Sequence, residues 1–113
     1  MPFIETKISV PLTAKKEELI KTKFGQAISL LGKTEDYLMI GFQDQYDLFF
    51  AGNKLDKGAY VSVSLFGESS KDAYNKMTET ICQILYEELD IPKNKVYVTF
   101  HSCYNWGWNG QLF

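Results

Sequence analysis

The sequence contains no arginine: all twelve basic residues are lysines, and fourteen acidic residues bring the net charge to −2. A bound carboxylate or phosphate must therefore be held by lysine ammonium groups, backbone N–H groups or hydroxyls, because the bidentate guanidinium fork is missing. The nearly balanced charge also argues against a nucleic-acid partner, which requires a clustered basic face.

Cysteine and histidine are scarce as well. The two cysteines, Cys82 and Cys103, lie far apart and form no Cys-X-X-Cys pair, so reduced, packed thiols are expected. The single histidine, His101, follows the last strong strand position, and no serine, cysteine or carboxylate pattern marks a catalytic partner for it. Neither residue type points to a catalytic site by itself.

No apolar run approaches the length of a membrane span, and the N-terminus lacks the apolar stretch of a secretory signal. A cytoplasmic protein without a membrane partner is expected. Export by an unconventional route, which leaves no mark on a sequence, is the alternative. The 113 residues are 45% apolar and 15% aromatic, which predicts one ordered globular domain over residues 1–113.

Hydrophobic periodicity predicts two strand–helix–strand units. The first helix is expected to begin after Thr13, a suitable N-cap, and to stop at Gly32. The second is expected to begin at a sequence that resembles a capping box, Ser69-Ser70-Lys71-Asp72, and to be broken by Ile91-Pro92. A loop is expected over residues 51–58, and strands over residues 3–10, 38–42, 48–50, 60–66 and 96–100.

The two halves of the chain repeat each other with an offset of 58 residues. In this alignment Phe3 falls on Val61 and Leu38 on Val96, so pseudo-repeats cover about residues 1–57 and 58–113. Each repeat fits a βαβ unit with parallel strands. The expected fold is α/β (α+β), a four-stranded sheet with two helices on one face. The other face needs a cover, which predicts self-association.

A proline follows the initiator methionine. Pro2 is small enough for the usual processing peptidase to remove Met1, which would expose a secondary amine. An α-amine titrates near ~7.7–8.0, and an apolar pocket or a nearby cation lowers that pKa enough to make the amine a base at neutral pH. The plain alternative is that Met-Pro is an ordinary chain start.

The C-terminal segment is rich in aromatic residues, which asparagines and glycines separate. These smaller residues favour tight turns. We expect the segment to pack against the rest of the chain or a neighbouring subunit, because it is too apolar to extend into water. Its aromatic residues, counted from the last predicted strand, are Tyr97, Phe100, Tyr104, Trp106, Trp108 and Phe113.

Several separated motifs coincide in this chain. They are Met1-Pro2 before a strand, Gly32-Lys33 at a helix end, Ser64-Leu65-Phe66-Gly67 at a strand end, Val96-Tyr97-Val98, and the closing Asn105-Trp106-Gly107-Trp108-Asn109-Gly110. Together they resemble the macrophage migration inhibitory factor family of the tautomerase superfamily. The resemblance spans essentially the whole chain.

The resemblance implies a homotrimer in which three four-stranded sheets face inward as a barrel, with the helices outside. It also implies a pocket at each subunit interface, where the Pro2 nitrogen acts as a general base that removes a proton α to a carbonyl. The expected reaction is keto–enol tautomerisation of a small aromatic α-keto acid of the phenylpyruvate type. Neither a metal nor an organic cofactor is implied.

The resemblance also assigns roles to other residues. Lys33 would lower the pKa of the Pro2 amine and hold the substrate carboxylate, and the backbone N–H of Phe66 would bind a substrate oxygen. Tyr97 would enter the pocket from the neighbouring subunit, and Thr99 stands where many members carry a substrate-binding asparagine. Taken singly, these residues fit structural roles, as a solvated lysine, core aromatics or strand residues. The aromatic residues that would rim the pocket or pack at an interface are Tyr37, Trp108 and Phe113.

The residues leave two other functions open. The first is a secreted, cytokine-like signalling protein that binds a protein receptor, with the pocket secondary or vestigial. The second is a small ligand-sensing regulatory domain, which predicts no trimer and no dependence on a free N-terminus. A thiol redox activity is not expected, because the Cys-X-X-Cys of some members is replaced here by Gly58-Ala59-Tyr60-Val61.

Overall fold

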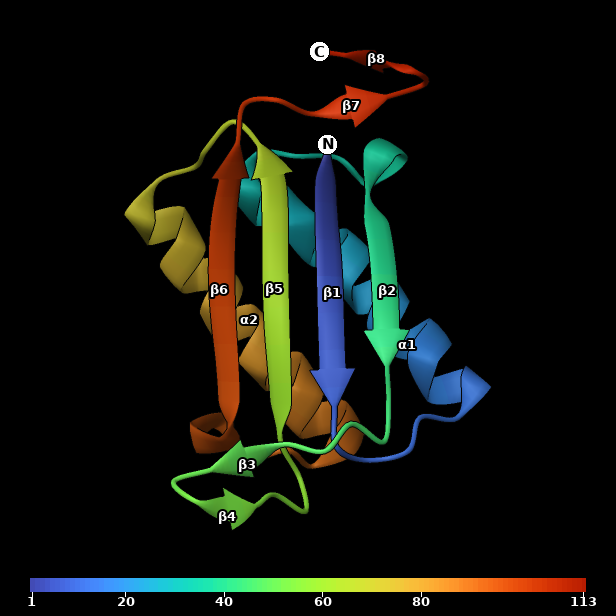
Figure 1. The fold of residues 1–113 in the computed structure, drawn as a ribbon, viewed down its shortest axis with the longest axis vertical. Coiled ribbons are helices and arrows are strands. Elements are labelled where there is room, and N and C mark those ends of the chain that lie inside the picture. Colours follow the sequence, from blue (N-terminus) through green and yellow to red (C-terminus); the bar gives the residue numbers. More distant parts are fainter.

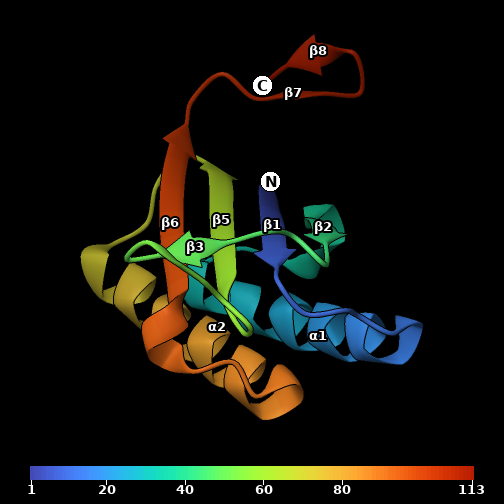
Figure 2. The ribbon, with the colours of Figure 1, turned by 60° about the horizontal axis from the view of Figure 1, so that its bottom comes forward.

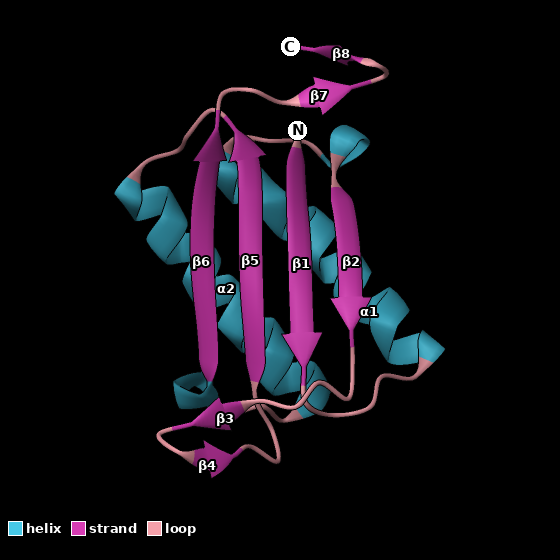
Figure 3. Ribbon diagram, viewed as in Figure 1, coloured by secondary structure: helices cyan, strands magenta, loops and turns pink.

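The computed structural model describes all 113 residues and places a four-stranded sheet at the centre of the molecule (Figure 1). Two long helices pack on it, and a short two-stranded hairpin lies at each end (Figure 3). The elements are β1 (Pro2–Ile8), α1 (Ala14–Ala27), η1 (Ile28–Leu31), η2 (Glu35–Tyr37), β2 (Met39–Gln43), β3 (Phe49–Phe50), β4 (Asn53–Lys54), β5 (Ala59–Phe66), α2 (Lys71–Leu89), η3 (Lys93–Lys95), β6 (Val96–Cys103), β7 (Gly107–Trp108) and β8 (Gln111–Leu112).

The sheet has the strand order β2-β1-β5-β6. β1 pairs in parallel with β2, and β5 pairs in parallel with β6, as the βαβ repeat predicts. The two halves join through antiparallel pairing of β1 with β5, in which Pro2 lies opposite Leu65 and Ile8 opposite Ala59. Both helices cover the same face of the sheet (Figure 2). These features confirm the predicted α+β fold class.

Strict alternation along β1 and β5 separates a buried face from an open one. Ile4 and Ile8 of β1, with Val61 and Val63 of β5, have no exposed surface and pack against the helices. Burial of such apolar area, at about 25 cal/mol per Å², is the main force that holds the layers together. The intervening residues stay partly exposed on the other face, which nothing in the chain covers.

Local side chains explain where the helices begin. Thr13 caps α1 as predicted, because its Oγ1 accepts a hydrogen bond from the Lys16 N–H at 3.1 Å. Ser70, rather than Ser69, caps α2 and accepts from the Ala73 N–H at 3.1 Å. Asp72 therefore does not stand at the box position, and the predicted reciprocal capping box is absent.

Two other boundaries differ from the prediction. The first helical segment does reach Gly32, which adopts a left-handed conformation, but its last turn, η1, is a 3₁₀ helix. The predicted loop over residues 51–58 contains β4, which pairs with β3 around a turn at Ala51 and Gly52, both at positive φ. No helix is both long enough and apolar enough to cross a membrane.

Candidate functional site

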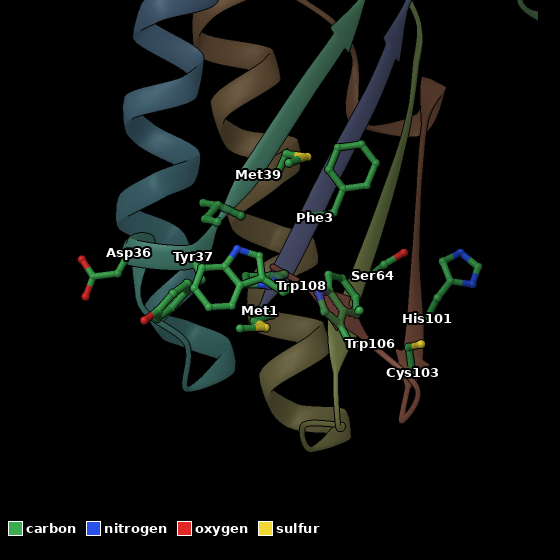
Figure 4. Close-up of a pocket in the computed structure, with 13 residues that line it drawn as sticks. Met1, Phe3, Asp36, Tyr37, Met39, Ser64, His101, Cys103, Trp106 and Trp108 are labelled. Carbon is green, nitrogen blue, oxygen red and sulfur yellow. The ribbon is translucent and has the colours of Figure 1, made fainter. Parts of the chain in front are cut away.

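A cavity of about 860 Å³ lies at the edge of the sheet where β1 begins. Because β1 runs antiparallel to β5, its first residues reach the same edge as the last residues of β5 and β6. The segment that enters β2 supplies another wall, and the β7–β8 hairpin lies over this end of the sheet (Figures 1 and 4). Eight of the thirteen lining residues are hydrophobic.

The chain end itself lines this cavity. Pro2 is buried, and Met1 is partly buried beside it. The pKa of the Met1 amino group lies below its ordinary value, mainly because burial removes water from the charged form and secondarily because the Lys33 ammonium repels it. This corner of the molecule therefore favours the neutral form of an amine, which is the form that can take up a proton.

Lys33 and Phe66 meet at the chain end, although they are far apart in the sequence. The left-handed turn at Gly32 delivers Lys33 from η1, and its Nζ donates a hydrogen bond to the Phe66 carbonyl oxygen at 2.9 Å. The backbone N–H of Phe66 donates to the Met1 carbonyl oxygen at 3.0 Å. The structure thus brings Pro2, Lys33 and the Phe66 peptide together.

The predicted rim aromatics form a continuous series of ring contacts. Tyr37 meets Trp108 edge to face at 5.4 Å between centroids, and Trp108 meets Phe113 at 6.0 Å. Phe113 in turn lies 6.0 Å from the ring of Phe66. Such pairs contribute about 0.5–1.5 kcal/mol each beyond their buried area. They hold the β7–β8 hairpin, which turns at Asn109 and Gly110, over the end of the sheet.

Tyr97 and Thr99 do not join this site within one chain. In the sheet register Tyr97 aligns with Tyr60 and Lys7, at the opposite end from Pro2. Tyr97 is 65% exposed, and its ring packs against that of Phe50 with 5.7 Å between the ring centroids. Thr99 lies in the middle of β6, where its Oγ1 is 2.8 Å from the hydroxyl oxygen of Tyr60.

Residues to which the sequence analysis assigned no role in the pocket also line the cavity. Ser64 and His101 are direct neighbours in the sheet register and lie on the β5–β6 side, as does Cys103 (Figure 4). The Nε2 atom of His101 is 2.9 Å from Thr99 Oγ1, which gives the histidine a polar partner. The alternation of β6 places Thr99, His101 and Cys103 on one face. This period of two residues is the feature of the sequence that could have predicted their proximity.

Few acidic or metal-binding side chains lie at the site. Asp36 lines the cavity but points its carboxylate outward (Figure 4). No group of three histidine, cysteine, aspartate or glutamate side chains comes together in a way that could hold a metal ion. The arrangement can act chemically through a desolvated amine, an ammonium group, a backbone N–H and an apolar wall.

Comparison with known proteins gives consistent results. The family model described as macrophage migration inhibitory factor (MIF) matches residues 1–113. Macrophage migration inhibitory factor from Xenopus laevis is 27% identical over 115 residues, covering 100% of this chain and 99% of the relative. The match with the full length of that relative agrees with the whole-chain resemblance seen in the sequence.

Solved structures agree as well. The crystal structure of Leishmania major MIF2 superimposes with a TM-score of 0.93 at 34% identity, covering 100% of this chain and 97% of that one. The macrophage migration inhibitory factor homologue from Prochlorococcus marinus gives a TM-score of 0.88 at 30% identity, with 98% of each chain covered. The chain belongs to the macrophage migration inhibitory factor family of the tautomerase superfamily.

Proposed function

We propose that the protein is a cofactor-independent keto–enol tautomerase for small aromatic α-keto acids of the phenylpyruvate type. Its general base is the Pro2 nitrogen, which becomes an amine when Met1 is removed. The observation that carries the proposal is the position of the chain end, at an apolar cavity where burial and Lys33 both lower the pKa of the Met1 amino group, next to Pro2. Family membership supports the same class of activity.

The chemistry requires one proton to leave carbon and one to reach oxygen. The Pro2 amine takes a proton from the carbon next to the ketone, and the protonated Pro2 returns a proton to the ketone oxygen, so the enol forms without a net change in atoms and the amine is regenerated. A base whose pKa lies near the working pH performs such a transfer efficiently. A retained Met1 would leave the Pro2 nitrogen as an amide without basicity.

The neighbouring groups fit the two ends of such a substrate. The Lys33 ammonium and the Phe66 N–H would hold the carboxylate, since the chain has no arginine to do so. Tyr37 and Trp108 would receive the aromatic ring, because both line the cavity and their rings meet edge to face, and Phe113 would support Trp108 from outside the lining. Specificity for aromatic acids would follow from this combination of one charge and several rings.

We further propose that the active form is a homotrimer. The open face of the sheet and its outer strands β2 and β6 have no partner within the chain. Tyr97 is exposed and lies far from Pro2, so it can serve the site only from a neighbouring subunit. Three inward-facing sheets would cover the open face and bring Tyr97 and Thr99 towards the Pro2 site of an adjacent chain.

Replacement of the proposed base tests the mechanism. Phenylpyruvate tautomerisation should fall about 10²-fold in Pro2→Gly, because a positioned general base contributes at least that much. Pro11→Gly is the matched control, since Pro11 lies outside the cavity and is exposed. Intact-mass measurement must first show that Met1 has been removed from each protein. Equal rates in the native protein and Pro2→Gly would contradict the role of Pro2.

A signalling role is the second candidate, favoured by the name that the Xenopus laevis relative carries. In this case the protein would leave the cytoplasm by an unconventional route and bind a receptor on another cell, with the cavity secondary. Saturable binding of the labelled protein to intact cells, equal for the native protein and Pro2→Gly, would support it. Absence of saturable binding would contradict the signalling role.

A further inference from the structure

The first residue of the chain occupies the candidate site in the way a ligand would. Met1 lines the cavity together with Trp106 and Trp108 (Figure 4). Its carbonyl oxygen accepts the hydrogen bond from the Phe66 N–H at 3.0 Å. We propose that Met1 is an internal ligand of the site, so that the folded chain that retains Met1 is self-occupied at the donor that a substrate oxygen would use.

The register of the sheet explains why this donor depends on Met1. The antiparallel ladder between β1 and β5 ends at the pair of Pro2 and Leu65, so the Phe66 N–H lies just beyond it. A ladder N–H needs a carbonyl acceptor on the facing strand, and continuation of the antiparallel register places Met1 opposite Phe66. The carbonyl of Met1 is therefore the partner that the Phe66 N–H uses in the folded chain.

The adjacent amide provides a contrast. The Gly67 N–H donates to the Cys103 carbonyl oxygen at 2.8 Å, which does not involve the chain end. Removal of Met1 should therefore free the Phe66 N–H and leave the Gly67 N–H bonded. A buried or half-buried N–H without a partner is unfavourable, so the freed N–H is ready to donate a hydrogen bond to a new oxygen.

The location of the freed donor indicates which oxygen it would take. The Lys33 Nζ lies against the carbonyl of the same residue, Phe66, at 2.9 Å. An N–H beside an ammonium group favours an anionic acceptor, and a carboxylate is the group of this kind in the proposed substrate. Loss of Met1 would thus create the base and vacate the carboxylate donor in a single step. This inference rests on the proposed function for the identity of the acceptor.

Amide hydrogen exchange of two adjacent residues tests the proposal. The 113-residue chain is produced with methionine aminopeptidase inhibited, the 112-residue chain without inhibition, and intact mass verifies both. We expect exchange at Phe66 to be about tenfold faster in the 112-residue chain, which corresponds to the loss of one hydrogen bond, with Gly67 unchanged. Addition of 3-phenylpropionate, a carboxylate that cannot tautomerise, should slow Phe66 exchange again in the 112-residue chain only.

The outcomes separate this inference from the proposed function. Equal exchange at Phe66 in both chains would overturn the inference, as would a parallel change at Gly67, which indicates general fraying of the strand ends. If Phe66 responds as expected but the 112-residue chain does not tautomerise phenylpyruvate, the internal-ligand role holds and the enzyme proposal fails. If the 112-residue chain is active but Phe66 exchange does not change, the enzyme proposal stands and the inference fails.

Discussion

Lys33 influences the chain-end amine through its charge, and this effect is separable from its contact with substrate. Its ammonium is the second cause, after burial, of the lowered pKa at the N-terminus. The neutral amine is the active base, so kcat/KM should rise with pH through its pKa. In Lys33→Met the pKa of the Pro2 amine should increase, and the rising limb of the pH–rate profile should move to higher pH.

Lys76 of α2 supplies the control for this experiment, because it is exposed and lies outside the cavity. Lys76→Met should leave the profile in place. A simple loss of kcat/KM in Lys33→Met, with the rising limb unmoved, would show that Lys33 binds substrate without tuning the base.

Thr6 is a polar residue without a polar partner. Its side chain has no exposed surface, and its Oγ1 makes no hydrogen bond in the core beneath the helices. Thr6→Val keeps the shape and removes the unpaired hydroxyl, so the free energy of unfolding should increase by about 1 kcal/mol. Urea denaturation at fixed protein concentration measures this change. The exposed Thr22→Val is the control, and a decrease in stability for Thr6→Val would contradict the interpretation.

For individual residues, the sequence indicated which side chains belong to the site but not the contacts that they make. The Met-Pro start and the Gly32-Lys33 motif suggested a basic amine near a lysine, and the structure brings these residues together. The contact between Met1 and Phe66 depends on the antiparallel register of two strands that are distant in sequence, which no local pattern specifies. The contact between His101 and Thr99 was missed although it is local, since the alternation of β6 places the two residues on one face.

The two helices are joined by an ion-pair network centred on Glu88 of α2. Its carboxylate oxygens lie 2.7 Å from Lys23 Nζ and 3.1 Å from Lys16 Nζ, both on α1. The pKa of Glu88 is lowered, first by the hydrogen bond from Lys23 and then by that from Lys16. A carboxyl group whose pKa is lower in the folded state stabilises the fold above its unfolded pKa and loses that contribution as the pH falls.

Acid unfolding tests this network. As the pH falls below ~4.3, the unfolded pKa of glutamate, the native protein should lose stability more steeply than Glu88→Gln, which cannot titrate at this position. Urea denaturation midpoints between neutral pH and pH ~3 measure the difference. Glu79→Gln, on the same helix and without a lysine partner, should behave like the native protein. Parallel curves for the native protein and Glu88→Gln would contradict the role of the network.

The main helices and strands were predictable because their hydrophobic patterns are regular and extend over many residues. Alternation identified β1 and β5, the run of residues 96–100 after the helix break indicated β6, and the helical spacing of apolar residues identified both helices. The β3–β4 hairpin was missed in part, since β4 consists of two polar residues, Asn53 and Lys54, with no alternation to detect. The capping residue of α2 was displaced by one position because Ser69 and Ser70 are equally suitable in sequence.

Within one chain, residues of the proposed site lie at opposite ends of the sheet. Pro2 begins β1 at one edge of the sheet, whereas Tyr97 lies near the other. In a homotrimer of this 13.0 kDa chain the two residues would come from different subunits. Pro2→Gly and Tyr97→Ala should each lower the activity. Mixed trimers of the two variants should recover part of it, because some sites then contain neither substitution.

Sedimentation equilibrium and activity of the mixed samples measure this complementation. Trimers of each variant alone provide the baseline, and exchange of subunits must be shown by mass spectrometry of the intact assemblies. Recovery above the mean of the two baselines supports a shared site. A monomeric protein, or mixed trimers without recovered activity, would contradict the proposed assembly.

The most direct measurement for the account as a whole compares the two forms of the chain end. The 112-residue and 113-residue chains, verified by intact mass, are assayed for phenylpyruvate tautomerisation at the same concentration. The 112-residue chain should catalyse the reaction, and the 113-residue chain should be slower by about 10²-fold or more, because its Pro2 nitrogen is an amide. Equal rates for the two chains would show that the Pro2 amine is not the base.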